Sequence, residues 1–221
     1  MRLSIVIPTW NEVRYLGRTL DSLQGIDAEI VCVDGASNDG TPGLARSFGV
    51  TVIRSPRGRG LQLQQGVLAT HGEILWFLHA DTVVRCDAMD QINQVCVDPR
   101  IVGGNFHLLF DGSTRGARFQ NRLYPRLARV GIRYGDSGIF VRRTAYQESG
   151  GFRPLPLFED LDLLRRMLQY SQGAALTDLS RATAACARTT SSASRRIASF
   201  SAGTPDCART MPRTIAATWR T

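Results

Sequence analysis

Two acidic segments in the first half of the chain each follow an apolar run. Asp34 ends the run EIVCVD, and the turn GASNDGT after it carries Asp39. A carboxylate at the carboxyl end of a buried strand can accept hydrogen bonds from a uracil-type ring N–H or from ribose hydroxyls. Asn38, Asp39 and Gly40 are equally typical of a turn that caps the next helix. We therefore interpret Asp34 as a ligand-binding residue, and both interpretations stay open for Asp39.

The second acidic segment is LHADT, in which Asp81 comes shortly after the apolar strand EILWFLH. A divalent cation prefers oxygen ligands and often takes only one or two from the protein, with the others from phosphates and water. A cation on Asp81 would neutralise the charge that grows on a departing nucleoside diphosphate. The alternative is a cap ahead of the helix expected over Cys86–Val97, and the tripeptide alone does not decide.

Two arginines stand among glycines in SPRGRGLQ, where a helix is expected to begin. The guanidinium groups of Arg57 and Arg59, together with backbone N–H groups at a helix start, are suited to binding a phosphate. A solvated basic loop is the other interpretation.

A third acidic segment, PLFEDLDLLRRM, places Glu159, Asp160 and Asp162 at the start of an expected helix. Acids are favoured there by the helix dipole, which is a sufficient structural explanation. The functional alternative is that Asp160 or Glu159 removes a proton from an acceptor hydroxyl.

The elements that position these segments alternate between strand and helix. Apolar strands separated by helices predict a parallel sheet that is covered on both faces. Right-handed crossovers then bring the loops after the strands to one edge of the sheet, where all the polar clusters of the first half would meet. The predicted strands are Leu3–Thr9, Glu29–Asp34, Val50–Arg54 and Glu73–His79, with helices after Asn11 as a cap and over Thr41–Phe48 and Arg59–Thr70.

In the second half of the sequence, strand and helix patterns alternate less regularly. The patterns predict helices over Cys86–Val97, Gly116–Val130 (basic and amphipathic) and Asp160–Tyr170, and strands over Ile101–Phe110 and Gly138–Arg142.

The composition changes near Gly173, and we predict a domain over residues 1–172 followed by an atypical tail over 173–221. The tail is rich in Ala, Thr, Ser and Arg and has little apolar periodicity. Such a segment buries too little apolar surface to offset the conformational entropy that it would lose on ordering. This predicts a disordered or loosely docked tail. Its composition is also what an out-of-frame reading of a GC-rich gene would encode.

The chain has 221 residues and a net charge of +8, with no lysine among its 27 basic residues. Residues 1–172 hold 20 Arg against 17 acids, and the tail holds 7 Arg against 2. The excess is concentrated in the tail, and no helical stripe of base-reading side chains is evident, so we expect no nucleic-acid partner. Five scattered cysteines without CxxC spacing predict reduced thiols. We expect a cytoplasmic protein, with peripheral contact to the inner face of the membrane allowed by the basic tail.

The order of the motifs resembles glycosyltransferase family 2, which has the GT-A fold. The collinear pieces are IVIPTWNE, VDGASNDGT, RGRG, FLHADT, GDSGIFVRR and FED, within residues 2–170. More narrowly, the chain is similar to a compact bacterial subgroup with HAD at the metal motif. The resemblance implies a Rossmann-like α/β fold with a mixed, mainly parallel sheet and helices on both faces. It also implies sugar transfer from a nucleotide-diphosphate sugar, with a UDP-sugar expected first, to a hydroxyl acceptor on a lipid or saccharide.

The same resemblance implies roles for individual residues. It places a divalent cation, Mg2+ or Mn2+, on Asp81, and it makes Asp160 of the Glu159–Asp160 pair the base in an inverting hexosyl transfer. His79 stands where the motif has its first acid, which leaves one carboxylate for the metal. The residues expected at the donor are Pro8, Thr9 and Glu12 beside the nucleotide, Asp34 on the base, Asp39, Arg57, Arg59 and Ala80, and Asp136 of GDSG beside the sugar or acceptor.

Three other functions remain in competition. A sugar-phosphate nucleotidyltransferase would share the architecture, but it would begin with a Gly-rich phosphate loop and a lysine, and this chain has neither. A non-catalytic or C-terminally damaged nucleotide-sugar-binding protein is suggested by the tail. A dehydrogenase is disfavoured because no GxGxxG follows the first strand.

Overall fold

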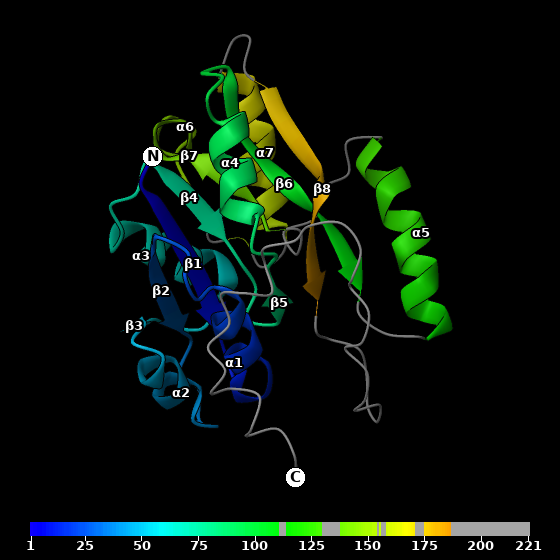
Figure 1. The fold of residues 1–221 in the computed structure, drawn as a ribbon. Helices are drawn as coiled ribbons and strands as arrows, with labels where there is room; N and C mark the ends of the chain where they lie inside the picture. Colours follow the sequence, from blue (N-terminus) through cyan, green and yellow to red (C-terminus); the bar gives the residue numbers. More distant parts are fainter. Residues whose placement is uncertain (111–113, 130–137, 154, 156–157, 171–174, 187–221) are drawn as a thin grey trace. The chain divides into compact units, whose positions relative to one another are not determined.

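The computed structural model describes residues 1–110, 114–129, 138–153, 155, 158–170 and 175–186 (Figure 1). The chain divides into two compact units, Met1–Thr189 and Thr190–Thr221, and every described residue belongs to the first. Within the described residues, no helix combines the length and apolarity that a bilayer crossing requires.

The described strands form one sheet in the order β3-β2-β1-β4-β7-β6-β8-β5. Strands β1 to β4 are mutually parallel, whereas β7 is antiparallel to both β4 and β6. Because two reversals cancel, β6 runs in the same direction as β1 and β4. The predicted mixed, mainly parallel sheet is thus confirmed. Its strands are β1 (Leu3–Thr9), β2 (Ala28–Asp34), β3 (Thr51–Arg54), β4 (Ile74–Phe77), β5 (Thr82–Val83), β6 (Ile101–Phe110), β7 (Phe140–Arg142) and β8 (Ala175–Cys186).

Helices cover both faces of the sheet, because the side chains of each buried strand alternate between two cores. Ile5 and Ile7 of β1 pack with side chains of α1, α2 and α4, whereas Val6 packs with side chains of α3, α6 and α7. The prediction of helices on both faces is confirmed. The helices are α1 (Val13–Ser22), α2 (Thr41–Ser47), α3 (Arg59–Leu68), α4 (Ala88–Val95), α5 (Arg115–Arg129), α6 (Arg143–Glu148) and α7 (Glu159–Tyr170).

Helix α3 lies unusually close to the sheet at Gly66. A Cβ atom on Gly66 would lie 2.2 Å from Cγ1 of Val6 on β1 and 3.0 Å from Cγ2 of Val33 on β2. The absence of a side chain therefore lets the helix backbone rest on the two central strands. This close contact sets how near α3 lies to the sheet, and it brings the RGRG segment at the helix start near the ends of the strands.

The start of α1 differs from the prediction. Glu12, not Asn11, is the residue before the helix, and Asn11 has a positive φ of 55°. The side-chain oxygen of Asn11 instead accepts a hydrogen bond from the backbone N–H of Asn38 at 2.9 Å. Asn11 therefore ties the loop after β1 to the loop after β2, and it does not cap α1.

Strand β8 lies inside the segment 173–221, where the sequence pattern predicts no regular element. It pairs in parallel with β6 and antiparallel with β5. Its residues are mostly small, so a hydrophobic pattern is weak, and backbone pairing with a strand on each side holds it in the sheet instead. The sheet thus continues past residue 172, while residues 187–221 lie outside the described part of the chain.

Candidate active site

Three of the predicted acids are buried at the carboxyl edge of the parallel strands. Asp34 is the last residue of β2, and its neighbour in the sheet is Thr9, the last residue of β1. Asp81 follows β4 by four residues, and Asp160 lies at the start of α7. The exposed fractions are 1% for Asp34, 3% for Asp81 and 6% for Asp160. Burying a carboxylate is costly unless partners compensate it, so the contacts of each acid determine what it can do.

One carboxylate oxygen of Asp34 is hydrogen-bonded within the fold, and the other lacks a partner in the part of the chain that the structure describes. Oδ2 accepts a hydrogen bond from the backbone N–H of Ser37 at 3.1 Å. Oδ1 is buried and has no hydrogen-bond partner among the described residues. A buried acceptor without a partner marks a place where a ligand donor would complete the hydrogen bonding. This arrangement suits the ring N–H or ribose hydroxyl expected at Asp34.

Gln62 of α3 holds the two strands that carry this end of the site. Its Nε2 donates to the backbone carbonyls of Thr9 at 2.9 Å and of Val33 at 2.7 Å. Its Oε1 accepts from the backbone N–H of Gly58 at 3.3 Å. The sequence pattern did not single out Gln62 for a role; its only signal was its place in SPRGRGLQ. Pro8, which precedes Thr9, lines a small pocket at this edge.

Asp39 is occupied in holding the turn together. Oδ2 accepts from the backbone N–H of Val13 at 3.1 Å, and Oδ1 accepts from the backbone N–H and the hydroxyl of Thr41. Thr41 Oγ1 in turn accepts from the backbone N–H of Glu12 at 2.8 Å. Burial raises the pKa of Asp39, but these hydrogen bonds outweigh it and keep the pKa below its usual value. The contacts favour the turn interpretation for Asp39, whereas the N-cap of α2 is Gly40, and they place Glu12 next to that turn.

Arg57 lies over the ring of Trp10, with its guanidinium carbon 3.4 Å from the ring centroid. Trp10 is itself among the exposed large hydrophobic residues. A cation over an indole face is a favourable contact that also keeps the guanidinium at the edge of the site. Trp10 was not predicted as a site residue, although it stands within the motif IVIPTWNE.

Arg59 is the residue that joins separate motifs. Its Nε contacts Oε1 of Glu159, its Nη2 lies 3.3 Å from Oδ2 of Asp160, and its Nη1 lies 3.1 Å from Nε2 of His79. The start of α3 can come close to the segment before α7 because Gly60 has no side chain: a Cβ there would lie 2.8 Å from the Arg153 carbonyl oxygen. One guanidinium group therefore connects the acid pair of α7 with the HAD segment after β4.

The third acid of α7 has a different partner. Asp162 accepts from Nη2 of Arg166 at 2.7 Å and lies 3.6 Å from Nη1 of Arg153. Arg166 also donates to the backbone carbonyls of Ser149 and Gly151. Asp162 thus belongs to a structural cluster, which separates it from the Glu159–Asp160 pair at Arg59.

A small pocket lies where these groups meet. Asp160 and His79 both line it, so the acid pair of α7 and the HAD segment border the same small hollow. Its lining residues are Pro8, Arg59, Leu63, Phe77, Leu78, His79, Ile139, Phe152 and Asp160.

A family model for glycosyl transferase family 2 matches residues 4–149 of this chain. The chain belongs to glycosyl transferase family 2. An uncharacterized glycosyltransferase from Nostoc sp. is 26% identical over 170 residues, which cover 67% of this chain and 53% of the relative. A dolichyl-phosphate hexose transferase from Haloferax volcanii is 32% identical over 134 residues, which cover 58% and 54%. The chain therefore spans about half the length of the curated relatives it matches.

The fold of this family 2 glycosyltransferase also has relatives among solved structures. A mannosyltransferase from Pyrobaculum calidifontis, solved with GDP-Man and Mn2+, superposes with a TM-score of 0.67 at 21% identity. The match covers 84% of this chain and 56% of the mannosyltransferase. At this identity the likeness establishes the shared GT-A fold.

The HAD segment of the glycosyltransferase offers limited protein ligation to a metal. The turn is held by a hydrogen bond from Oγ1 of Thr19 to the Ala80 carbonyl at 2.7 Å and by one from the Thr82 N–H to the His79 carbonyl at 3.2 Å. No group of three or more His, Cys, Asp or Glu side chains in the described part of the chain could hold a metal by itself. The single carboxylate of Asp81 fits a cation that takes its other ligands from a bound diphosphate and water.

Two further predictions lie at the limits of the described residues. Asp136 is outside them, so its expected place beside the sugar or acceptor stays a prediction. Gly138 is described: its φ is +65°, and its carbonyl accepts from Nε1 of Trp76 at 3.1 Å. The end of the GDSG segment is thus anchored beside β4.

The cysteines only partly follow the prediction of reduced thiols. Cys32 and Cys96 are free and buried, but Cys86 forms a disulfide, so the prediction is wrong for Cys86. Cysteine count and spacing could not decide this, because pairing depends on which side chains the fold brings together. Burial, and then the charge of Asp34, raise the pKa of Cys32 to about 12. Cys32 is therefore a neutral thiol at physiological pH and is not suited to act as a nucleophile.

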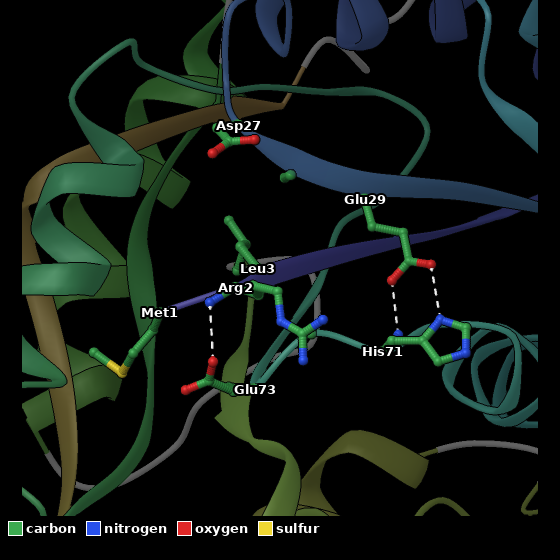
Figure 2. A pocket seen from close by; sticks show the side chains of 9 residues that line it. Met1, Arg2, Leu3, Asp27, Glu29, His71 and Glu73 are labelled. Atoms are coloured by element: carbon green, nitrogen blue, oxygen red, sulfur yellow. Dashed lines mark hydrogen bonds and ion pairs between the residues drawn. The ribbon is translucent and has the colours of Figure 1, made fainter.

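A larger, open hollow lies at the opposite, amino edge of the sheet. Figure 2 shows its most prominent contact: Glu29 accepts from the backbone N–H of His71 at 2.7 Å and lies 3.3 Å from its Nδ1. Glu29 also accepts from the hydroxyl of Ser4 at 2.8 Å. Ligands of open α/β sheets bind beyond the carboxyl ends of the strands, and this hollow lies at the other edge.

Proposed function

We propose that this chain transfers a hexosyl group from a nucleotide-diphosphate sugar to a hydroxyl of a lipid or saccharide acceptor. The observation that carries the proposal is the contact of Arg59 with both Asp160 and His79. It brings an acid suited to deprotonate the acceptor next to the segment that faces the diphosphate. The family match supports glycosyl transfer as the reaction class. Because this chain spans only about half the length of its curated relatives, the nature of the acceptor is part of the proposal.

The donor side of the proposal is built on Asp34. Its Oδ1, which has no hydrogen-bond partner within the described ranges, would accept a hydrogen bond from the base or the ribose. Thr9 and Pro8 border the same place, and Arg57 on Trp10 offers its charge to a phosphate from the exposed side. We propose a UDP-sugar as the first donor to test and a GDP-sugar as the second, since the solved mannosyltransferase holds GDP-Man.

Asp81 would hold the divalent cation, Mg2+ or Mn2+, together with the donor diphosphate. When bound, the cation would supply positive charge to the leaving nucleoside diphosphate. Because the protein offers one buried carboxylate here, metal and donor should bind together, each weakly in the absence of the other. Ala80 shapes this turn through its backbone carbonyl, which is held by Thr19.

Asp160 is the proposed base. Its carboxylate takes the proton of the acceptor hydroxyl as the oxygen attacks the anomeric carbon. The bond from that carbon to the diphosphate oxygen breaks on the opposite side, and the nucleoside diphosphate leaves. A single displacement of this kind inverts the anomeric configuration. Glu159 and Arg59 orient Asp160, because Arg59 contacts both acids.

The test uses the purified full chain with UDP- and GDP-sugars and Mn2+. We expect Asp160→Asn to bind donor within about twofold of wild type while donor hydrolysis or transfer falls by at least about 100-fold. Asp81→Asn should lose the Mn2+-dependent part of donor binding in calorimetry. Glu73→Gln, at the amino edge, is the matched control and should leave both unchanged.

Two outcomes would contradict the proposal. If the wild-type chain binds neither kind of donor with Mn2+, the donor site is wrong. If Asp160→Asn turns over like wild type, Asp160 is not the base. Donor binding without turnover on any acceptor would favour the non-catalytic alternative, and release of pyrophosphate from a nucleoside triphosphate would favour a nucleotidyltransferase.

A further inference from the structure

Helix α5 carries an unusual density of positive charge. Its sequence RGARFQNRLYPRLAR has five arginines and no acid. The arginines fall at positions 115, 118, 122, 126 and 129, so successive ones are three or four residues apart. At 3.6 residues per turn, this spacing places all five on one side of the helix.

The described side chains of α5 show that this surface faces solvent. Arg115, Arg118 and Arg122 are exposed. Phe119, one position along from Arg118, has an exposed fraction of 65%, which is high for a large aromatic residue. Leu123, one turn further along from Phe119, is half-buried. A basic stripe bordered by an exposed aromatic side chain and a half-buried leucine is the pattern of a helix that lies at a membrane surface.

The topology attaches this helix to the edge of the sheet that holds the candidate active site. β6 runs parallel to β4, and its residue Gly104 is level with Trp76 across β7, so its last residue, Phe110, lies past the carboxyl end of β4. After α5 the described chain resumes at Gly138, where a Cβ atom would lie 3.1 Å from the side chain of Leu78, just after β4. Both described ends of the segment that carries α5 therefore lie on the carboxyl side of the sheet, the side on which Asp34, Asp81 and Asp160 are buried.

We propose that α5 binds the surface of an anionic lipid bilayer, with its arginines at the lipid headgroups and Phe119 inserted among the acyl chains near them. Charge complementarity selects this partner, because the helix has five cations, no anion and an apolar border. A bilayer accepts both the charge and the exposed aromatic ring, whereas a purely electrostatic partner would leave Phe119 in water. Docking in this way would hold the carboxyl edge of the sheet close to acceptors that reside in the membrane.

The test measures co-sedimentation of the full chain with vesicles of phosphatidylglycerol and phosphatidylcholine, compared with vesicles of phosphatidylcholine alone. We expect binding to the anionic vesicles only. The double variant Arg115→Gln with Arg118→Gln should weaken it at least about tenfold, since each basic residue near an anionic surface contributes about fivefold. Phe119→Ser should also weaken it, and Arg115→Lys with Arg118→Lys should retain it.

The matched control is Arg46→Gln with Arg165→Gln, which removes the same charge from exposed positions on α2 and α7. Equal loss of binding in this control, absence of binding by wild type, or equal binding to neutral vesicles would overturn the proposal. Tighter, α5-dependent binding to a single-stranded RNA would overturn it in favour of a nucleic-acid surface. The measurement needs neither donor nor turnover, so its failure would leave the proposed transfer reaction untouched.

Discussion

At the scale of single residues, Arg59 has the contacts that distinguish this site from a solvated basic loop. Its guanidinium group is shared between Glu159, Asp160 and His79. Its side chain is 34% exposed, whereas that of Glu159 is 3% exposed. The arginine therefore compensates a buried acid while it still reaches solvent. The sequence motif predicts that Arg59 binds a phosphate, whereas its contacts favour a role in positioning Asp160.

We expect Arg59→Lys to lower kcat by roughly 10–100-fold while the donor Kd stays within about twofold. A lysine keeps the charge but lacks the planar fork that contacts three partners, so Asp160 would lose its fixed position. Steady-state kinetics with donor titration calorimetry separates the two effects. A large rise in the donor Kd with unchanged kcat would instead make Arg59 a phosphate ligand, and Arg57→Lys serves as the comparison at the exposed neighbour.

A second prediction at the scale of single residues concerns Asp34, because its buried Oδ1 lacks a hydrogen-bond partner in the described structure. Asp34→Asn should weaken nucleotide binding by roughly 10–100-fold, the range for losing a hydrogen bond to a charged group. Calorimetry with UDP and with GDP measures this change. Asp39→Asn is the control: its carboxylate holds the turn, so we expect lower stability with nearly unchanged nucleotide affinity. Equal affinities for wild type and Asp34→Asn would remove Asp34 from the donor site.

At the scale of elements, α3 sets the geometry of the site. Gln62 joins it to the ends of β1 and β2, and Arg59 joins it to α7 and to the loop after β4. Gly66 lets the helix rest on the sheet, close to Val6. A small shift of α3 would therefore displace the donor end and the base end of the site together.

Gly66→Ala should destabilise the fold by about 1–3 kcal/mol, because its Cβ would overlap Cγ1 of Val6 in a fully packed interface. Urea unfolding measures the loss. The matched control is Gly17→Ala in α1, where the atom nearest to an added Cβ would be Cδ2 of Leu44 at 3.9 Å. That change should be neutral or stabilising by up to about 1 kcal/mol. Equal effects of the two substitutions would show that α3 adjusts freely on the sheet.

At the scale of the whole molecule, the described sheet does not stop where the composition changes. β8 lies between β6 and β5 in the sheet order, so it contributes hydrogen bonds on both sides. The first compact unit extends to Thr189, well beyond the predicted boundary at residue 172. The two curated relatives are nearly twice as long as the matched region, and their remaining length has no counterpart in the match.

A pair of truncations tests this organisation. Ending the chain after Thr189 should change Tm by no more than a few degrees, because the boundary between the compact units lies there. Ending it after Gly173 should lower Tm much further, because β6 and β5 would both lose the strand between them. Thermal unfolding followed by circular dichroism compares the two. Equal Tm values would show that β8 contributes nothing to the folded unit.

Local patterns in the sequence determined most of the first half of this protein. Hydrophobic periodicity depends only on neighbouring residues, so it located β1 to β4 and the helices between them to within a few residues. The direction of parallel strands then placed Thr9, Asp34 and Asp81 at one edge before any contact was known. The family motifs added Asp160 to that set.

Only the tertiary structure decided which residues meet across long separations. Arg59 and Glu159 are 100 positions apart, and Gln62 reaches carbonyls 53 and 29 positions away. Neither pairing leaves a local pattern, because each depends on how closely α3 packs on the sheet. The same reason explains β8 and the disulfide of Cys86: backbone pairing and side-chain approach depend on the packed fold, which composition and spacing do not encode.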